Sequence, residues 1–238
     1  MIWAVQNNIK ITATPNQTAS CPSCNEKVIS KCGSIKVWHW AHTIDTDCDS
    51  WSEGETEWHK GWKDNFPKEQ QEVVIGSHRA DIKNSNGKVI ELQNSPIASE
   101  TITAREEFYK NMIWLLNGKT FAKNLWLRGK ENYVSFRWKH PPKSWWVANK
   151  EIYIDLGEFA TKTDLSRLVW QQVRFNYNQM ENDQIFQKEF NRLWDKYVAE
   201  GFFDYNYKIL CIRKIHHNIP CGGWGILLTK QEFLQKFK

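Results

Sequence analysis

Two short stretches on either side of an Asn-Gly pair constrain the fold of this chain more than any other feature. Residues 78–82 and 89–93 alternate apolar and polar side chains, which is the pattern of half-buried β-strands. Asn86 and Gly87 lie between them, and this pair is typical of a tight turn because both residues tolerate a positive φ. The sequence therefore predicts a β-hairpin.

Asp81 lies on the first strand of this hairpin, and Glu91 and Gln93 lie on the second. Side chains two residues apart on a strand share a face, so Glu91 and Gln93 should point the same way, with Asp81 brought alongside. Two carboxylates held close repel each other unless a cation lies between them, and oxygen ligands suit magnesium or manganese. Such a site can hydrolyse phosphodiesters. A solvated acidic hairpin explains these residues equally well.

Further short motifs follow a fixed order around the hairpin. They are Cys21-Pro22-Ser23-Cys24, His39-Trp40-Ala41-His42, Glu55-Thr56 with His59 and Lys63, Arg79-Ala80-Asp81, Glu91-Leu92-Gln93 with Ser95-Pro96-Ile97, and Arg105 with Tyr109. As a set in this order they resemble the family of the competence protein CoiA and its CoiA-like nuclease relatives. The resemblance covers about the first half of the chain.

The spacing of Asp81, Glu91 and Gln93 also resembles the PD-(D/E)xK nuclease signature, with Gln93 where lysine is usual. The CoiA-like pattern itself carries glutamine at this place. Together the resemblances imply a restriction-endonuclease-like core, a small zinc-binding element in front of it, and a role in handling DNA. Asp81 and Glu91 would bind catalytic magnesium or manganese, and Gln93 would orient water and phosphate.

Four of the six cysteines fall in the first 48 residues, which favours metal binding over disulfides in a chain without an evident export signal. His39 and Cys32 are reserve ligands, and a reduced, metal-free segment is the alternative. Zinc here would be structural, because so short a piece cannot bury enough apolar area to fold alone. The predicted tetrahedral set is Cys21, Cys24, His42 and Cys48.

Residues 52–66 are predicted to form the first helix of the core, with Ser52 and Glu55 as a capping box. Its packing stripe would be Trp58, Trp62 and Phe66. Glu55, His59 and Lys63 would lie along an adjacent stripe. The resemblance assigns Glu55 to the metal site, whereas ordinary helix salt bridges at four-residue spacing are the alternative.

The rest of the predicted core supplies the remaining supporting residues. A strand at 72–75, a helix at 99–110 and strands at 112–116 and 124–128 complete an α-β-β-β-α-β order. Arg105 is expected to bind a phosphate or to hold a catalytic carboxylate. The supporting or substrate-binding candidates are His59, Lys63, Glu72, Arg79, Arg105 and Tyr109.

The overall prediction is an α/β (α+β) chain in three parts. These are a zinc-binding element at 1–50, a PD-(D/E)xK nuclease-like core at 51–132, and a mixed extension at 133–238 that covers the core. Within the extension, the sequence predicts strands at 151–156, 207–212 and 224–228, a helix at 181–200, and a last helix opened by a capping box of Thr229 and Glu232.

The predicted function is metal-dependent hydrolysis of a nucleic-acid phosphodiester. A net charge of +5 fits a nucleic-acid partner, with DNA preferred and RNA left open. A recombination or defence-system protein is a further candidate partner. No membrane-spanning stretch is evident and the cytoplasm is the expected location. The rival hypothesis is a non-catalytic DNA-binding adaptor that keeps the nuclease fold.

Overall fold

The protein is described by a computed structural model of mixed α+β architecture, as the sequence predicts. The described residues are 1–44, 48–51, 54–120, 124–129, 132–157, 184, 188–189, 191–193, 208–216 and 221–238. They fall into two compact units: unit 1 is Met1–Leu115 with Val147–Lys150 and Phe237–Lys238, and unit 2 is Leu116–Trp146 with Glu151–Lys236. The functional division at residues 50 and 132 stays a prediction.

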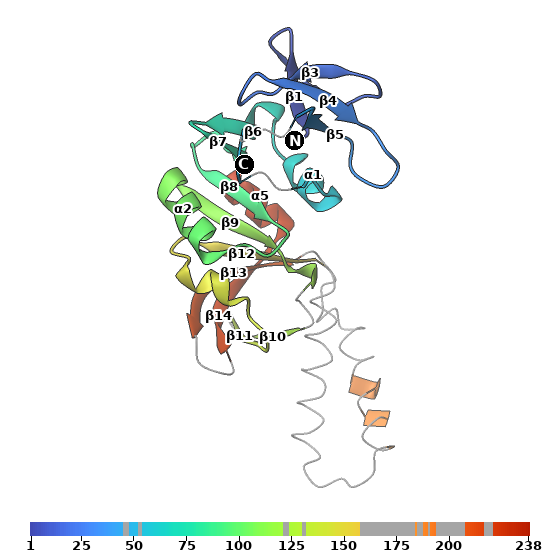
Figure 1. Ribbon diagram of the computed structural model, residues 1–238. Helices are drawn as coiled ribbons and strands as arrows, with labels where there is room; N and C mark the ends of the chain where they lie inside the picture. The colour runs from blue at the N-terminus through green and yellow to red at the C-terminus, as the bar shows by residue number, and fades with distance from the viewer. Residues whose placement is uncertain are drawn as a thin grey trace. The chain divides into compact units, whose positions relative to one another are not determined.

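Unit 1 begins with a five-stranded antiparallel sheet, drawn in blue in Figure 1. Its strands are β1 (Trp3–Gln6), β2 (Ile9–Thr12), β3 (Thr18–Ser20), β4 (Lys27–Lys31) and β5 (His39–His42), in the order β2-β1-β3-β4-β5. The buried core of this sheet consists of small residues and one large one: Ala4, Ala13, Cys21, Val28 and Trp40. So small a core buries little apolar surface, so another source of stability is needed.

The rest of unit 1 follows the predicted α-β-β-β-α-β succession. Its elements are α1 (Glu57–Lys63), β6 (Gln71–Ile75), β7 (His78–Lys83), β8 (Val89–Gln93), α2 (Ser99–Tyr109) and β9 (Met112–Asn117), with a short 3-10 helix at Lys68–Gln70. The strands are hydrogen-bonded in the order β9-β8-β7-β6. Figure 1 shows α2 lying beside β8 and β9. The buried side chains here include Trp62, Ile82, Ile90, Ile102 and Ile113.

The predicted hairpin is confirmed. β7 and β8 are antiparallel, with Ile82 opposite Ile90 and Lys83 opposite Val89. Gly87 has a φ of +73° in the turn, which explains why glycine follows asparagine here. The hairpin therefore carries Asp81 and Glu91 on neighbouring strands.

The first helix is shorter than predicted. α1 begins at Glu57 because Thr56 is its N-cap, accepting a hydrogen bond from the His59 N–H at 3.3 Å. The predicted capping box of Ser52 and Glu55 is therefore wrong: Glu55 precedes the helix, and Ser52 lies outside the described residues.

Unit 2 contains β10 (Leu125–Gly129), β11 (Val134–Trp138), β12 (Ile152–Gly157), β13 (Lys208–His216) and β14 (Cys221–Thr229), followed by α5 (Lys230–Phe237). These strands are paired antiparallel in the order β10-β11-β14-β13-β12. The predicted capping box is confirmed, since Thr229 N–H donates to Glu232 Oε2 at 2.7 Å and Glu232 N–H donates to Thr229 Oγ1 at 3.1 Å.

The predicted helix at 181–200 lies mostly outside the described residues. Those described within it (184, 188–189 and 191–193) are helical. Among the described helices, none combines the length and apolar character that crossing a bilayer requires.

Candidate functional site

The four predicted zinc ligands come together at the N-terminal sheet. Cys21 and Cys24 lie in the turn between β3 and β4, His42 ends β5, and Cys48 follows it. The donor atoms all lie within 4.8 Å of one another. Cys21 Sγ is 3.5 Å from Cys48 Sγ, and Cys24 Sγ is 3.3 Å from His42 Nε2. Donors bonded tetrahedrally to one zinc lie roughly 3.5–3.8 Å apart, so this set could hold zinc.

The cluster of Cys21, Cys24, His42 and Cys48 is named here the knuckle. The local backbone explains its shape. Asn25 adopts a φ of +61°, and its N–H donates to the Cys21 carbonyl at 3.0 Å, which closes the turn. The Ser23 N–H donates to Cys21 Sγ at 3.4 Å, a contact that favours the thiolate. Neither reserve ligand belongs to the cluster: Cys32 packs against the small core, and His39 Nδ1 lies 2.8 Å from the Val37 carbonyl oxygen.

The carboxylates predicted for the second site line one pocket of unit 1, with most of the predicted supporting residues. The lining residues are Trp51, Gly54, Glu55, His59, Lys63, Glu72, Arg79, Asp81, Glu91, Leu92 and Arg105. Four carboxylates face three Lys and Arg cations there, so the pocket carries one excess negative charge when all are ionised. A divalent cation would reverse that sign and make the pocket attractive to a phosphate.

Lys63 lies at the centre of this pocket. Its Nζ is 3.0 Å from Glu55 Oε2, 3.0 Å from Glu72 Oε1 and 3.1 Å from Asp81 Oδ1. Burial alone would lower the pKa of Lys63, but the three carboxylates together raise it above its ordinary value. The lysine is therefore a fixed positive charge. The salt bridge to Glu55 also differs from the predicted four-residue helical spacing, because Glu55 stands ahead of α1.

Asp81 and Glu91 are joined across the hairpin by side chain to backbone hydrogen bonds. The Asp81 N–H donates to Glu91 Oε1 at 3.3 Å, and the Leu92 N–H donates to Asp81 Oδ2 at 3.0 Å. Burial opposes ionisation of Asp81, but Lys63 and the Leu92 N–H hold its pKa below the usual range. The Asp81 side chain is 23% exposed, whereas that of Glu91 is 4% exposed. Asp81 therefore offers the accessible oxygen of the pair.

Glu91 has the opposite titration behaviour. Burial and then the Asp81 charge raise its pKa to about 7, against the pull of Arg105. Arg105 Nη1 donates to Glu91 Oε2 at 2.8 Å, and Nη2 donates to the Trp51 carbonyl at 2.7 Å. The Arg105 Nε–H is buried without an acceptor among the described residues.

Glu72 is tied to the chain's first residues. Its carboxylate accepts hydrogen bonds from the Ile2 N–H at 2.8 Å and the Trp3 N–H at 3.0 Å, in addition to Lys63. Its φ of +46° is unusual for a non-glycine residue. Burial would raise the pKa of Glu72, but Lys63 and the other nearby positive charges lower it. Glu72 thus fastens the N-terminal sheet to β6.

The remaining predicted residues occupy different positions. His59 Nε2–H donates to the Leu92 carbonyl at 3.1 Å, and the imidazole lines the pocket. Arg79 also lines it. Gln93 and Tyr109 are not among the described lining residues: the Gln93 amide donates to the Ser95 carbonyl at 2.9 Å, and Tyr109 packs edge-on against Trp51.

Two residues that hold side chains or backbone near the pocket, Asp49 and Trp51, could not be predicted from the sequence. Asp49 binds His78 Nδ1 at 2.9 Å and accepts from the Arg79 N–H at 3.2 Å. Trp51 stacks on His78 with ring centroids 3.3 Å apart and orients Arg105 through its carbonyl. Neither residue belongs to a spaced motif, because each acts through segments about 30 residues or more distant in the chain.

The geometry defines a small β-sheet element in which three cysteine sulfurs and one imidazole form a four-donor knuckle, followed by a carboxylate pocket. Residues 5–50 match the family model of the competence protein CoiA, N-terminal domain. The predicted resemblance to the CoiA family is therefore confirmed over these residues, which match its N-terminal domain. No curated protein and no solved structure matches the chain.

Proposed function

We propose that this protein is a metal-dependent nuclease with a restriction-endonuclease-like core, acting on DNA in the cytoplasm. The matched family is named for a competence protein, which supports a competence-related role and, with it, a recombination or defence-system protein as a partner. The observation that carries the proposal is the convergence of Asp81, Glu91 and Glu55 in one pocket with Lys63 and Arg105.

The donor set fits a hard divalent cation. Asp81 and Glu91 would hold magnesium or manganese, with Glu55 completing or supporting a second position. When bound, the ion would acidify a water and neutralise charge on the phosphate. The pocket has a cavity volume of ≈ 30 Å³. This volume is enough for a water-sized occupant.

The chain's own residues have separate roles in this reaction. Asp81, the most exposed of the four carboxylates that line the pocket, faces the incoming phosphate. Arg105 holds Glu91 in place from α2. Lys63 supplies, from α1, the positive charge that Gln93 does not carry on β8. Gln93, bonded to Ser95, shapes the end of the strand.

The rival function is a DNA-binding adaptor that retains the fold. The described pocket argues against it on energetic grounds. Burying a carboxylate such as Glu91 costs stability unless it is paired, and replacement by apolar residues is often neutral or stabilising. A chain with no use for cations at this place would gain nothing by keeping four acidic side chains together.

The test is cleavage of labelled single- and double-stranded DNA and RNA in magnesium or manganese. Asp81→Asn and Glu91→Gln should each lower cleavage at least a hundredfold, and EDTA should do the same to the wild-type chain. The two losses should not add, because both carboxylates serve one centre.

Glu106→Gln is the matched control. Glu106 is also a buried glutamate, but it accepts hydrogen bonds from Trp114 Nε1 at 2.9 Å and the Asn149 N–H at 2.8 Å. This variant should keep its cleavage rate. If the wild-type chain cuts no nucleic acid with either metal, yet it and both pocket variants bind DNA equally, the adaptor function is correct.

A further inference from the structure

Unit 2 carries an exposed sheet face with its own chemistry, formed by β11, β14 and β13. Along β11, Val134, Phe136 and Trp138 are buried while Arg137 between them is exposed. Because alternate residues of a strand share a face, the exposed side chains of β11 point away from the core of unit 2. The register extends this face across the two neighbouring strands.

Two rows of side chains cross this face. Trp224 on β14 lies opposite Ser135 on β11 and Lys214 on β13. Gly222 lies opposite Arg137 and His216 in the same way. Side chains directly opposite on antiparallel strands are about 4.5–5.5 Å apart at Cβ. Gly222 therefore lies between Arg137 and His216, in the row next to the exposed tryptophan.

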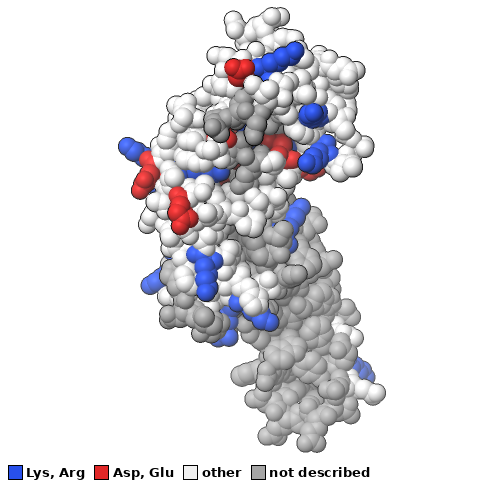
Figure 2. All heavy atoms as spheres, in the orientation of Figure 1, with Lys and Arg blue, Asp and Glu red and all other residues white. Residues whose placement is uncertain are grey.

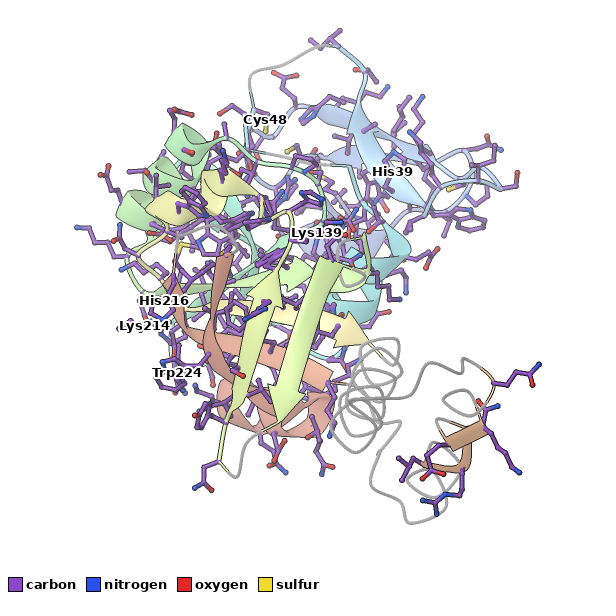
Figure 3. The ribbon with its side chains drawn as sticks, turned by 90° about the horizontal axis from the view of Figure 1, so that it is seen from below. His39, Cys48, Lys139, Lys214, His216 and Trp224 are labelled. Atoms are coloured by element: carbon purple, nitrogen blue, oxygen red, sulfur yellow. The ribbon has the colours of Figure 1, made fainter. Side chains whose placement is uncertain are left out.

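Aromatic surface is available on the same face. Trp224 is 40% exposed and Tyr133 is 44% exposed. Their ring centroids are 5.9 Å apart, with planes inclined by 73°, so they support each other edge to face. Figure 3 shows Trp224, Lys214 and His216 together on β13 and β14. Exposed aromatic rings bordered by cations are typical of surfaces on which bases stack.

The charged side chains in the two rows of this face are cationic. Arg137 and Lys214 lie in these rows and no Asp or Glu does, whereas Arg213 on β13 is paired with Glu151 at 2.9 Å. In the region of Figure 2 where Figure 1 draws β10, β11, β13 and β14, the described atoms include Lys and Arg, and no Asp or Glu is visible on this side. Such a face is complementary to a polyanion.

We propose that the face of Tyr133, Arg137, Lys214, His216 and Trp224, named here the Trp224 face, binds a single strand of nucleic acid. A base stacks on Trp224, and phosphates lie against Arg137 and Lys214. A single strand fits better than a duplex, because a duplex keeps its base faces stacked inside and cannot offer one to Trp224. The inference does not depend on cleavage in the carboxylate pocket.

The experiment measures anisotropy of a labelled oligothymidine with the full-length chain in EDTA, where no cleavage occurs. Trp224→Ala should weaken binding roughly 5- to 150-fold, the range found for loss of one base–aromatic stack. Trp224→Phe should recover most of the affinity, because it keeps a ring of similar orientation. Glu106→Gln, which changes neither the Trp224 face nor the carboxylate pocket, should bind as the wild type does, and the absence of metal separates this result from the nuclease proposal.

Charge is tested through salt dependence. Lys214→Gln should make the plot of log affinity against log salt less steep by about 0.7, the share of one phosphate contact on a single strand. Lys110→Gln is the matched control: it removes the same charge from an exposed position at the end of α2 and should leave the slope unchanged. Circular dichroism checks that each variant is folded.

Four results would overturn the proposal. One is wild-type affinity in folded Trp224→Ala, and another is a salt slope that Lys214→Gln and Lys110→Gln change equally. Equal affinity for duplex and single strand would also overturn it. If the chain binds no oligonucleotide at low salt, the face serves a protein partner instead and the proposal is wrong.

Discussion

The knuckle and the carboxylate pocket of unit 1 are both candidate metal sites, but they balance their charges differently. The knuckle's donor atoms face one another, with Cys21 Sγ 3.5 Å from Cys48 Sγ. The pocket instead supplies its own cations, as Lys63 shows by contacting three carboxylates. A cluster of donors without built-in cations needs an ion to fold, whereas a pocket with its own cations can fold first and take an ion later.

The largest expected effect follows from the knuckle. Purified protein should contain about one zinc per chain, and Cys24→Ser should lose it. The small core around Trp40 cannot replace the contribution of the ion, since structural zinc binding is worth about 10–16 kcal/mol in isolated zinc fingers. The N-terminal sheet of Cys24→Ser should therefore unfold, as measured by metal analysis and amide hydrogen exchange of β1–β5.

Cys32→Ser is the control for this prediction. Cys32 lies next to the same core but outside the donor cluster. It should keep its zinc and most of its stability. Full zinc content in Cys24→Ser, or loss of zinc in Cys32→Ser, would show that the four-donor assignment is wrong.

The next effect concerns the pocket's internal cation. Lys63→Met leaves Glu55, Glu72 and Asp81 without their shared partner, and removing one member of a buried ion pair costs about 3–5 kcal/mol. Denaturant unfolding should show this loss in EDTA. Manganese should restore part of it, because a divalent ion can neutralise the same carboxylates.

Lys60→Met is the matched control in the same helix. Lys60 pairs with Asp64 at 2.6 Å, but both side chains are about half exposed. A solvent-exposed pair of this kind contributes at most about 1 kcal/mol. Equal stability of the Lys60 and Lys63 variants would mean that the pocket does not depend on its internal cation.

A smaller effect depends on pH. In metal-free protein, Glu91 has a pKa raised to about 7, so folding favours its protonated form. This stabilisation is fully present below the unfolded pKa near 4.5 and is lost as the pH rises through about 7. Relative to Glu91→Gln, the wild type should lose up to about 3 kcal/mol between these values. Unfolding curves at several pH values measure it, and a constant difference would contradict the prediction.

Local patterns in the sequence were enough to predict the hairpin and the closing capping box. Ile82 lies between Asp81 and Lys83, the Asn86-Gly87 pair follows, and Thr229 and Glu232 are three residues apart, so each signal lies within a few residues. The role of Glu72 could not be predicted, because its carboxylate accepts from the Ile2 N–H 70 residues away. A backbone donor leaves no trace in side-chain spacing, and the same holds for the Trp51 carbonyl on Arg105.

Substitution of Gln93 has the smallest expected effect. It tests whether the alternation of side chains along β8 is enough to place a residue in the pocket. Period two places Gln93 on the same face as Glu91, yet its amide donates to the Ser95 carbonyl at 2.9 Å and it does not line the described pocket. Gln93→Ala should therefore cost about 1 kcal/mol, the worth of a typical hydrogen bond. It should slow cleavage less than tenfold, while Glu91→Gln slows it at least a hundredfold. Equal losses in the two variants would mean that Gln93 contacts the reacting phosphate, and that Lys63 does not replace it.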